Sequence, residues 1–213
     1  ALTGNQGVSF NGTSMAAPHI SGVMALLRQL RPGWSVEELK ALVMNTANHD
    51  LFTAAGQTGN KYGPARVGAG RVDVEQAARS FVVLYNANDE GAVSVSFGNI
   101  EVVGTYTAEK VVKVVNKHAS QTFNYNVALD QRVSIPGVTF ALLNPDNTPL
   151  TTLSLGPGQQ KTFKVRLTAD ASQMTHTRDV TVNATQAGLP RHWISEAAAL
   201  ITLTPSGGGT QPA

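Results

Sequence analysis

Apolar residues in the first third of the chain recur at the spacing of amphipathic helices. In residues 14–30 they fall at i, i+3, i+4, i+7 and i+10, which places them on one helical face. This predicted stripe consists of Ile20, Val23, Met24, Leu27 and Leu30. The Arg-Pro-Gly sequence at 31–33 is typical of a helix end, so we expect the first helix to stop there.

Two further helices are predicted before residue 80. Ser35, with Glu38 three positions later, forms a capping-box pattern that starts the second helix. Its predicted stripe is Val36, Leu39, Val43 and Thr46. A third, shorter helix begins near Asp73, and its apolar face is Val74, Ala77 and Ala78. The glycine-rich stretch 56–70 between them predicts a loop.

From about residue 90 the apolar spacing changes to two, which is typical of half-buried strands. The alternating sets are Val93, Val95 and Phe97; Phe123, Tyr125, Val127 and Leu129; Phe163, Val165 and Leu167; Val180, Val182 and Ala184; and Ala199, Ile201 and Leu203. Turn sequences at 136–137, 144–147 and 156–158 separate some of these sets. Short strands at regular spacing predict an all-β antiparallel sandwich.

The change of period predicts a chain in three parts. We expect a helical first domain over residues 1–84, a β-sandwich over residues 85–205, and a Gly/Ser-rich tail over residues 206–213. Hydrophobic residues make up 42% of the 213 residues and charged residues 14%, which is enough to build cores and is unlike a disordered chain.

Composition excludes several classes of function. The chain has no cysteine, so disulfides, thiolate metal sites and a cysteine nucleophile are excluded. The net charge is +2 without a basic run, so we expect no nucleic acid partner. No apolar run reaches the ~18 residues of a membrane span. The five histidines show no metal-ligand spacing, and we expect no cofactor.

The sequence Gly12-Thr13-Ser14 carries the candidate chemistry. Glycine permits a sharp turn and a close approach of the backbone. We expect Ser14 to be the N-cap of the first helix, with Pro18 near enough to the helix start to be tolerated. A serine there has an exposed hydroxyl at the positive end of the helix dipole, and its own N–H can face a developing oxyanion. These are requirements of an acyl-transfer nucleophile.

The longer sequence GTSMAAPHISG at residues 12–22 closely resembles the nucleophile segment of the subtilisin-like serine proteases. Two later stretches resemble the same family in the same order: residues 34–47, which look like the helix after the nucleophile helix, and GAGRVD at 68–73, which looks like the segment that closes the catalytic domain. The resemblance covers about residues 1–80. It implies the C-terminal part of an α/β peptidase domain, with Ser14 as nucleophile and Gly12 and Thr13 supporting the nucleophile loop.

The resemblance also implies partners outside these residues. In subtilisin-like enzymes the triad follows the order Asp, His, Ser, so the aspartate, the histidine and the asparagine that completes the oxyanion hole are expected upstream of Ser14. The upstream part of the catalytic domain is therefore an expected partner, and calcium sites are possible in a full-length parent. The family implies a polypeptide substrate and secretion.

Residues 85–205 resemble the fibronectin-III-like domain that follows the catalytic domain in larger subtilases. The resemblance rests on four short sequences: VVN at 114–116, YNV at 125–127, PGV at 136–138 and LGPGQ at 155–159.

No residue of the chain itself is an evident base for Ser14. His19 is five positions on, so at 3.6 residues per turn it points away from Ser14. His49, Asp50 and His192 have no motif around them and are expected at the surface. The isolated chain is therefore expected to be inactive.

Two functions remain open from the sequence. In the first, the chain is a fragment of a serine endopeptidase that hydrolyses peptide bonds through an acyl-enzyme on Ser14. In the second, it is a non-catalytic β-sandwich used for adhesion or positioning, fused to a decayed protease remnant.

Overall fold

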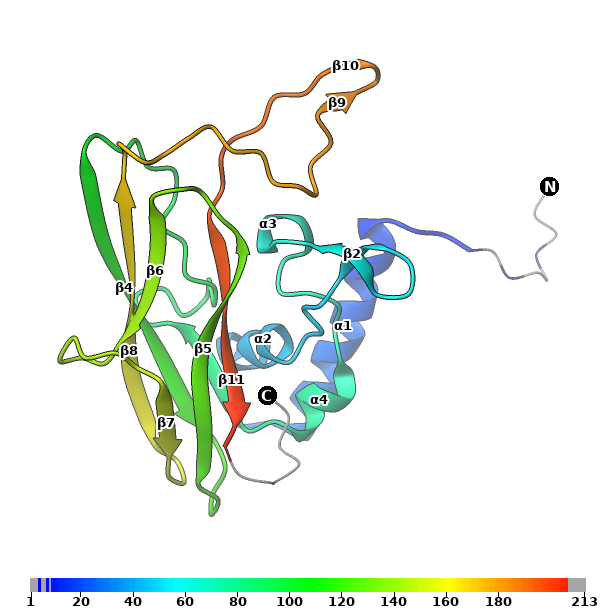
Figure 1. The fold of residues 1–213 in the computed structure, drawn as a ribbon. Coiled ribbons are helices and arrows are strands. Elements are labelled where there is room, and N and C mark those ends of the chain that lie inside the picture. Colours follow the sequence, from blue (N-terminus) through cyan, green and yellow to red (C-terminus); the bar gives the residue numbers. More distant parts are fainter. Residues whose placement is uncertain (1–3, 5–6, 8, 207–213) are drawn as a thin grey trace.

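The computed structural model describes residues 4, 7 and 9–206 (Figure 1). Of the predicted tail, only Ser206 falls within these residues, and 207–213 lie outside them. Within the described part of the chain, no helix is both long and apolar enough to cross a membrane.

The helical elements lie in the first eighty residues. They are α1 (Thr13–Leu30), α2 (Val36–Asn45), α3 (Pro64–Val67) and α4 (Val74–Arg79), with a short hairpin of β1 (Phe52–Ala54) and β2 (Thr58–Lys61). The capping box of α2 is confirmed, because the Ser35 hydroxyl accepts from Glu38 N at 3.2 Å and Ser35 N donates to the Glu38 carboxylate at 3.0 Å. Asp73 caps α4 by accepting from Gln76 N at 2.9 Å.

The predicted helical stripes are only partly buried. Val23 and Leu27 of α1 are buried, whereas Ile20 and Leu30 are 40% and 48% exposed. In α2 the buried side chains include Leu39, Val43 and Thr46, but Val36 is 64% exposed. The stripe prediction is therefore wrong at Ile20, Leu30, Val36 and Val74, because no described element covers these side chains.

The strands of the rest of the chain pair only antiparallel among the described residues. The strands are β3 (Val82–Asn86), β4 (Thr105–Asn116), β5 (Phe123–Val133), β6 (Val138–Leu143), β7 (Thr152–Leu155), β8 (Gln160–Asp170), β9 (Thr185–Gln186), β10 (Leu189–Pro190) and β11 (Ala198–Pro205). A four-stranded sheet has the order β3-β4-β8-β6, a three-stranded sheet the order β11-β5-β7, and β9 and β10 form a small hairpin. The chain is thus mostly strand, with few helices.

One hydrophobic core joins the two larger sheets. Phe163 and Val114 of the four-stranded sheet pack in the same cluster as Tyr125 and Leu155 of the three-stranded sheet, and all four are at most 3% exposed. The alternation predicted over residues 123–129 and 163–167 is confirmed.

A buried asparagine joins the loops at one end of the core. Asn116 is fully buried, and its Nδ2 lies 2.8, 3.1 and 2.8 Å from the carbonyl oxygens of Gln121, Leu155 and Gly156. Its Oδ1 accepts from His118 N at 2.9 Å. A buried amide needs such partners, because an unsatisfied one would destabilise the fold.

Two predicted strands are wrong. Residues 93–97 have no ladder partner, and Val93 has a φ of 62°, in the left-handed region that β-strands do not use. Residues 180–184 form no strand either: Asp179 accepts from Thr181 N at 2.8 Å in a side-chain turn, and Val180 is 71% exposed.

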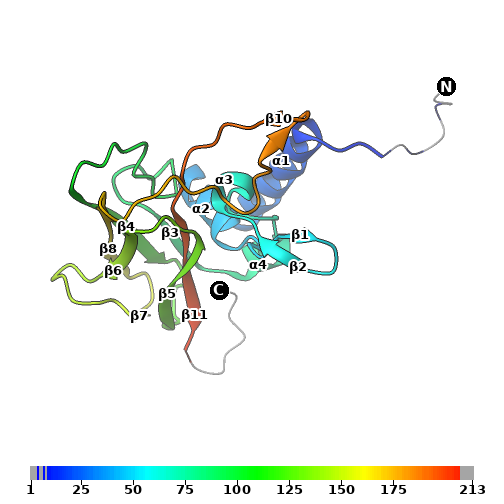
Figure 2. The same cartoon turned by 45° about the horizontal axis from the view of Figure 1, so that its top comes forward.

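The helices contact the four-stranded sheet through a second apolar cluster. Leu39 and Leu42 of α2 pack in one cluster with Val83, Tyr85 and Val115 of β3 and β4. We call this contact the apolar seam. The helices thus gather on one side of the sheets, with α2 against them and α1 farther out, in both views (Figures 1 and 2). The predicted boundary at 84–85 falls inside β3.

Candidate active site

Glycine sets the entry to α1. Gly12 is the N-cap of the helix, with φ 140° and ψ 171°. This region of backbone space is essentially restricted to glycine. The Gly12 carbonyl accepts from Met15 N and Ala16 N, both at 3.1 Å, so it begins the helical hydrogen-bond pattern. The sharp turn expected at Gly12 is therefore present.

Ser14 is not the N-cap, and that prediction is wrong. It is the second residue of α1, because Gly12 occupies the N-cap position and Thr13 is the first helical residue. Ser14 is exposed, and no described side chain bonds its hydroxyl. Its N–H belongs to the first turn, where amide groups have no intrahelical acceptor, and no backbone partner for it exists in the described part of the chain. Both its hydroxyl and its N–H are therefore open to a ligand.

Pro18 removes one helical hydrogen bond at Ser14. It is the sixth residue of α1, and the helix tolerates it as expected. A proline has no N–H, so it cannot donate to the carbonyl four residues earlier, which belongs to Ser14. The helix continues through Pro18 to Leu30.

His19 does not serve Ser14. Its Nδ1 lies 2.6 Å from the carbonyl oxygen of Met15, which can only accept, so this nitrogen carries the proton. The imidazole is thus bonded to its own helix and not to Ser14, which agrees with the prediction that His19 points away from Ser14. In the described residues, no histidine or carboxylate bonds Ser14, and a serine without a base is a weak nucleophile.

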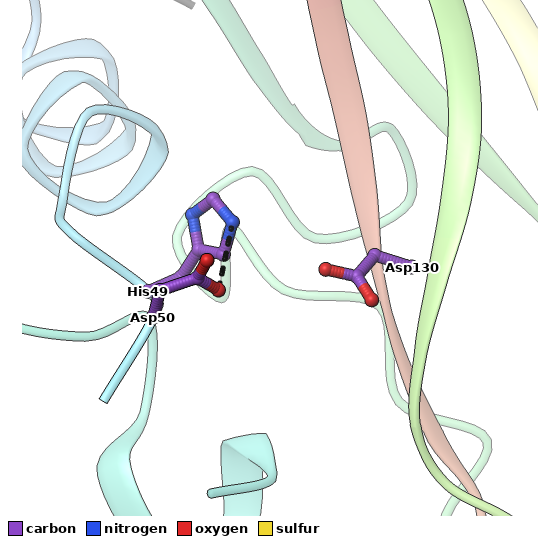
Figure 3. A group of neighbouring side chains, drawn as sticks. All are labelled: His49, Asp50 and Asp130. Carbon is purple, nitrogen blue, oxygen red and sulfur yellow. Dashed lines mark ion pairs between the residues drawn. The ribbon is translucent and has the colours of Figure 1, made fainter. Parts of the chain in front are cut away.

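The structure forms one charged cluster that the sequence did not reveal (Figure 3). His49 and Asp50 follow α2, and Asp130 of β5 lies opposite them. Their ligand atoms lie within 4.8 Å of one another, a spacing suited to a metal ion. However, Arg132 Nη2 lies 2.6 Å from carboxylate oxygens of both Asp50 and Asp130. Lys61 Nζ bonds Asp50 at 2.9 Å.

The cations of this cluster balance its carboxylates. The hydrogen bond from Lys61 and the one from Arg132 lower the pKa of Asp50 to about 2. Two carboxylates facing two cations have no excess negative charge for a metal ion, so we interpret the cluster as an ion-pair network. The signal in the sequence was the polar run Asp130-Gln131-Arg132, which interrupts an otherwise alternating strand.

Comparison with protein families places the similarity in the first third of the chain. Residues 1–70 match the subtilase family. The chain is 42% identical over 72 residues to the minor extracellular protease Vpr of Bacillus subtilis (strain 168), covering 34% of this chain and 8% of that protein. It is 42% identical over 78 residues to the alkaline elastase YaB of Bacillus sp. (strain YaB), covering 37% and 18%.

Subtilisin Savinase of Lederbergia lenta is 41% identical over 76 residues, which cover 36% of this chain and 24% of that protein. The chain thus spans less than a quarter of each of these relatives. Among solved structures, a FixG-related protein from Vibrio parahaemolyticus covers 49% of this chain and 97% of its own length, at 13% identity and a TM-score of 0.22. That score is too low to support a conclusion about the fold.

Proposed function

We propose that the chain is part of a secreted subtilisin-like serine endopeptidase, which hydrolyses peptide bonds in polypeptides through an acyl-enzyme on Ser14. The observation that carries the proposal is Ser14 itself: an exposed hydroxyl in the first turn of α1, inside the sequence GTSMAAPHISG. The match of residues 1–70 to the subtilase family supports it, as do relatives named as proteases, one of them extracellular.

In the proposed reaction the Ser14 hydroxyl attacks the substrate carbonyl while an upstream histidine takes its proton and gives it to the leaving amine. The unpaired N–H of Ser14 donates to the oxyanion that forms on the carbonyl oxygen. Water then hydrolyses the ester on Ser14 and releases the acyl group. Gly12 supports this geometry, because its conformation turns the chain into the helix immediately before Thr13 and Ser14. The histidine, the aspartate and a second oxyanion donor are supplied by residues that precede Ser14 in the family order.

The apolar surface of α1 supports such a missing partner. Met15, Ile20, Leu26 and Leu30 are 37%, 40%, 58% and 48% exposed. We propose that the preceding part of the same catalytic domain covers this surface, since a helix stripe requires burial against another element. The isolated chain of 213 residues is then inactive.

We further propose that the two-sheet part is a fibronectin-III-like sandwich. Its support is the core shared by a three- and a four-stranded antiparallel sheet. Two of the sequences quoted above lie at strand ends: residues 114–116 end β4, and residues 156–158 precede β8.

The test is Ser14→Ala in the complete protein, with the preceding catalytic segment present. We expect turnover of a peptide substrate to fall roughly 10⁶-fold, the loss that removal of the nucleophile causes in subtilisin. The melting temperature should hardly change, because Ser14 is exposed and caps nothing; exposed substitutions typically cost within about 0.5 kcal/mol.

Ser21→Ala is the matched control on the same helix. The Ser21 hydroxyl donates to the Ala17 carbonyl at 3.1 Å and lies seven positions from Ser14, so its loss should leave turnover unchanged. Retention of more than about a tenth of wild-type turnover in Ser14→Ala would exclude Ser14 as nucleophile. It would favour the alternative of a positioning module.

A further inference from the structure

We propose that Arg132 forms an electrostatic clamp that fastens the loop after α2 to the three-stranded sheet. The clamp consists of Arg132 and Asp130 of β5, Asp50 of the loop, and Lys61 at the end of β2. It is a second attachment between the helical part and the sheets, separate from the apolar seam. The proposal does not rest on the protease function, because no step of it involves Ser14.

The first support is the position of Arg132 in β5. Ala198 of β11 lies opposite Val133, and Ala199 lies opposite Gln131, so Arg132 has no partner across the ladder. This is a β-bulge, a feature that bends a strand and redirects a side chain. The Arg132 side chain is only 1% exposed.

The second support is the hydrogen bonding of the guanidinium. Arg132 Nη2 lies 2.6 Å from one oxygen of Asp50 and 2.6 Å from one oxygen of Asp130. Its Nε and Nη1 are buried and have no partner among the described residues. Both hydrogen bonds of the buried guanidinium are therefore made by Nη2. One of the two carboxylates that accept them, Asp50, belongs to the helical part of the chain. A buried charge that loses a partner destabilises the arrangement that buried it.

The third support is that the loop can transmit the attachment. Asn48 and Arg71 bond each other through both backbone groups, at 2.8 and 2.9 Å. Gly70 lies so close that a Cβ there would be 2.3 Å from the Asn48 carbonyl oxygen. Asp50 N also donates to Asn48 Oδ1 at 3.1 Å. These contacts link Asp50 through Asn48 to residues 70–71, which precede α4 in the chain. An attachment at Asp50 therefore also restrains residues 70–71.

The clamp and the apolar seam join different sheets. The seam packs α2 on β3 and β4 of the four-stranded sheet, where Lys117 also bonds Glu38 at 2.6 Å. The clamp reaches β5 of the three-stranded sheet. The helical part is thereby fixed to both layers, so it cannot pivot about the seam alone. His49 is a further titratable neighbour of the clamp, and its Nε2 lies 3.6 Å from Asp50 Oδ1.

The experiment is hydrogen–deuterium exchange on the full chain carrying Asp50→Asn. This variant leaves Asp130 to compensate Arg132, so the sheets should remain folded. We expect exchange in residues 46–62 and 68–73 to quicken by about tenfold, because local opening no longer breaks a charged contact. Exchange in β4 and β8 should stay at the wild-type rate.

Glu109→Gln is the matched control. Glu109 also pairs with two cations, Arg166 at 2.6 Å and Lys164 at 3.4 Å, but all three lie within the four-stranded sheet. It should leave residues 46–73 unchanged. The clamp is overturned if Asp50→Asn matches wild type over residues 46–73. It is equally overturned if β4 and β8 quicken as much as the loop, since the effect is then global unfolding.

Discussion

The two larger sheets and helix α1 treat their apolar residues in opposite ways. In the sheets the alternating side chains face one shared core, and Phe163 is 1% exposed. In the helical part, α1 buries Val23 and Leu27 but leaves Leu26 and Leu30 about half exposed, and Phe10 before it is 64% exposed. The difference shows that the sheets contain the partners that their sequence pattern demands, whereas α1 has an apolar surface beyond what the described residues cover.

The largest expected effect comes from making the same substitution in both parts. Phe163→Ala removes a fully packed ring from β8, and we expect it to cost about 3–5 kcal/mol of unfolding free energy. Phe10→Ala should change the free energy of unfolding by no more than about 0.5 kcal/mol, as is usual for exposed positions. Urea denaturation of both variants measures the contrast. Equal losses would show that Phe10 is packed in solution and that the two parts do not differ.

A smaller effect separates the two sides of α1. Leu27 is 1% exposed and its neighbour Leu26 is 58% exposed, so the same truncation probes both faces of one turn. We expect Leu27→Ala to cost about 2–3 kcal/mol, at the lower end of the range for buried leucine, because α1 packs on one side only. Leu26→Ala should cost less than about 0.5 kcal/mol. Thermal denaturation of both variants measures the difference. A loss of stability in Leu26→Ala as large as in Leu27→Ala would mean that the face of α1 that carries Leu26 is covered.

The smallest effect concerns the junction between the two parts. Cations hold the pKa of Asp50 at about 2, below its ordinary 3.8, so its contribution to stability is present above about pH 4 and is lost as pH falls through about 2. A carboxyl titration by NMR should place the Asp50 midpoint near 2. Lys61→Met should raise it, because the Lys61 hydrogen bond is the largest cause of the shift.

Lys164→Met is the control for this titration, since Lys164 pairs with Glu109 within the four-stranded sheet. It should leave the Asp50 midpoint unchanged. A wild-type midpoint near 3.8 would mean that the Asp50 ion pairs do not form in solution.

Local signals in the sequence located α1, α2, α4, β5, β8 and β11 and missed the other elements. The prediction of a loop over residues 56–70 is wrong, because β2 and α3 lie in it. The capping box of Ser35 and Glu38 and the cap at Asp73 place the starts of α2 and α4, because caps depend on residues three positions apart. The alternation over residues 123–129 and 163–167 likewise gives β5 and β8. These patterns work because each involves neighbours in the chain.

Features that depend on distant residues could not be predicted. Ile20 and Leu30 continue a regular stripe, yet their exposure depends on whether another element covers them. Residues 93–97 alternate as a strand does, but without a ladder partner they form none. The pairing of Arg132 with Asp50 joins residues 82 positions apart, and no spacing rule reaches that far.

At the candidate site, the sequence identified Ser14 but not its place in the helix. The motif permits either glycine or serine as the cap, and both types occur there. The backbone of Gly12 decides between them, because its φ of 140° leaves the cap position to glycine and moves Ser14 into the first turn. That dihedral angle is a property of the folded chain and is not written in any residue pattern.

Asn116 has a consequence for how this chain ages chemically. Its amide nitrogen faces three carbonyl oxygens, so the two hydrogens it carries are what the site requires. Deamidation would replace that nitrogen with an oxygen and turn three attractive contacts into repulsive ones, at a position with no exposure to water. The change alters the mass by about one dalton and barely alters the shape. It would also remove the hydrogen bonds that hold the β4–β5 loop to the turn before β8, so we expect a deamidated chain to be less stable at this end of the core.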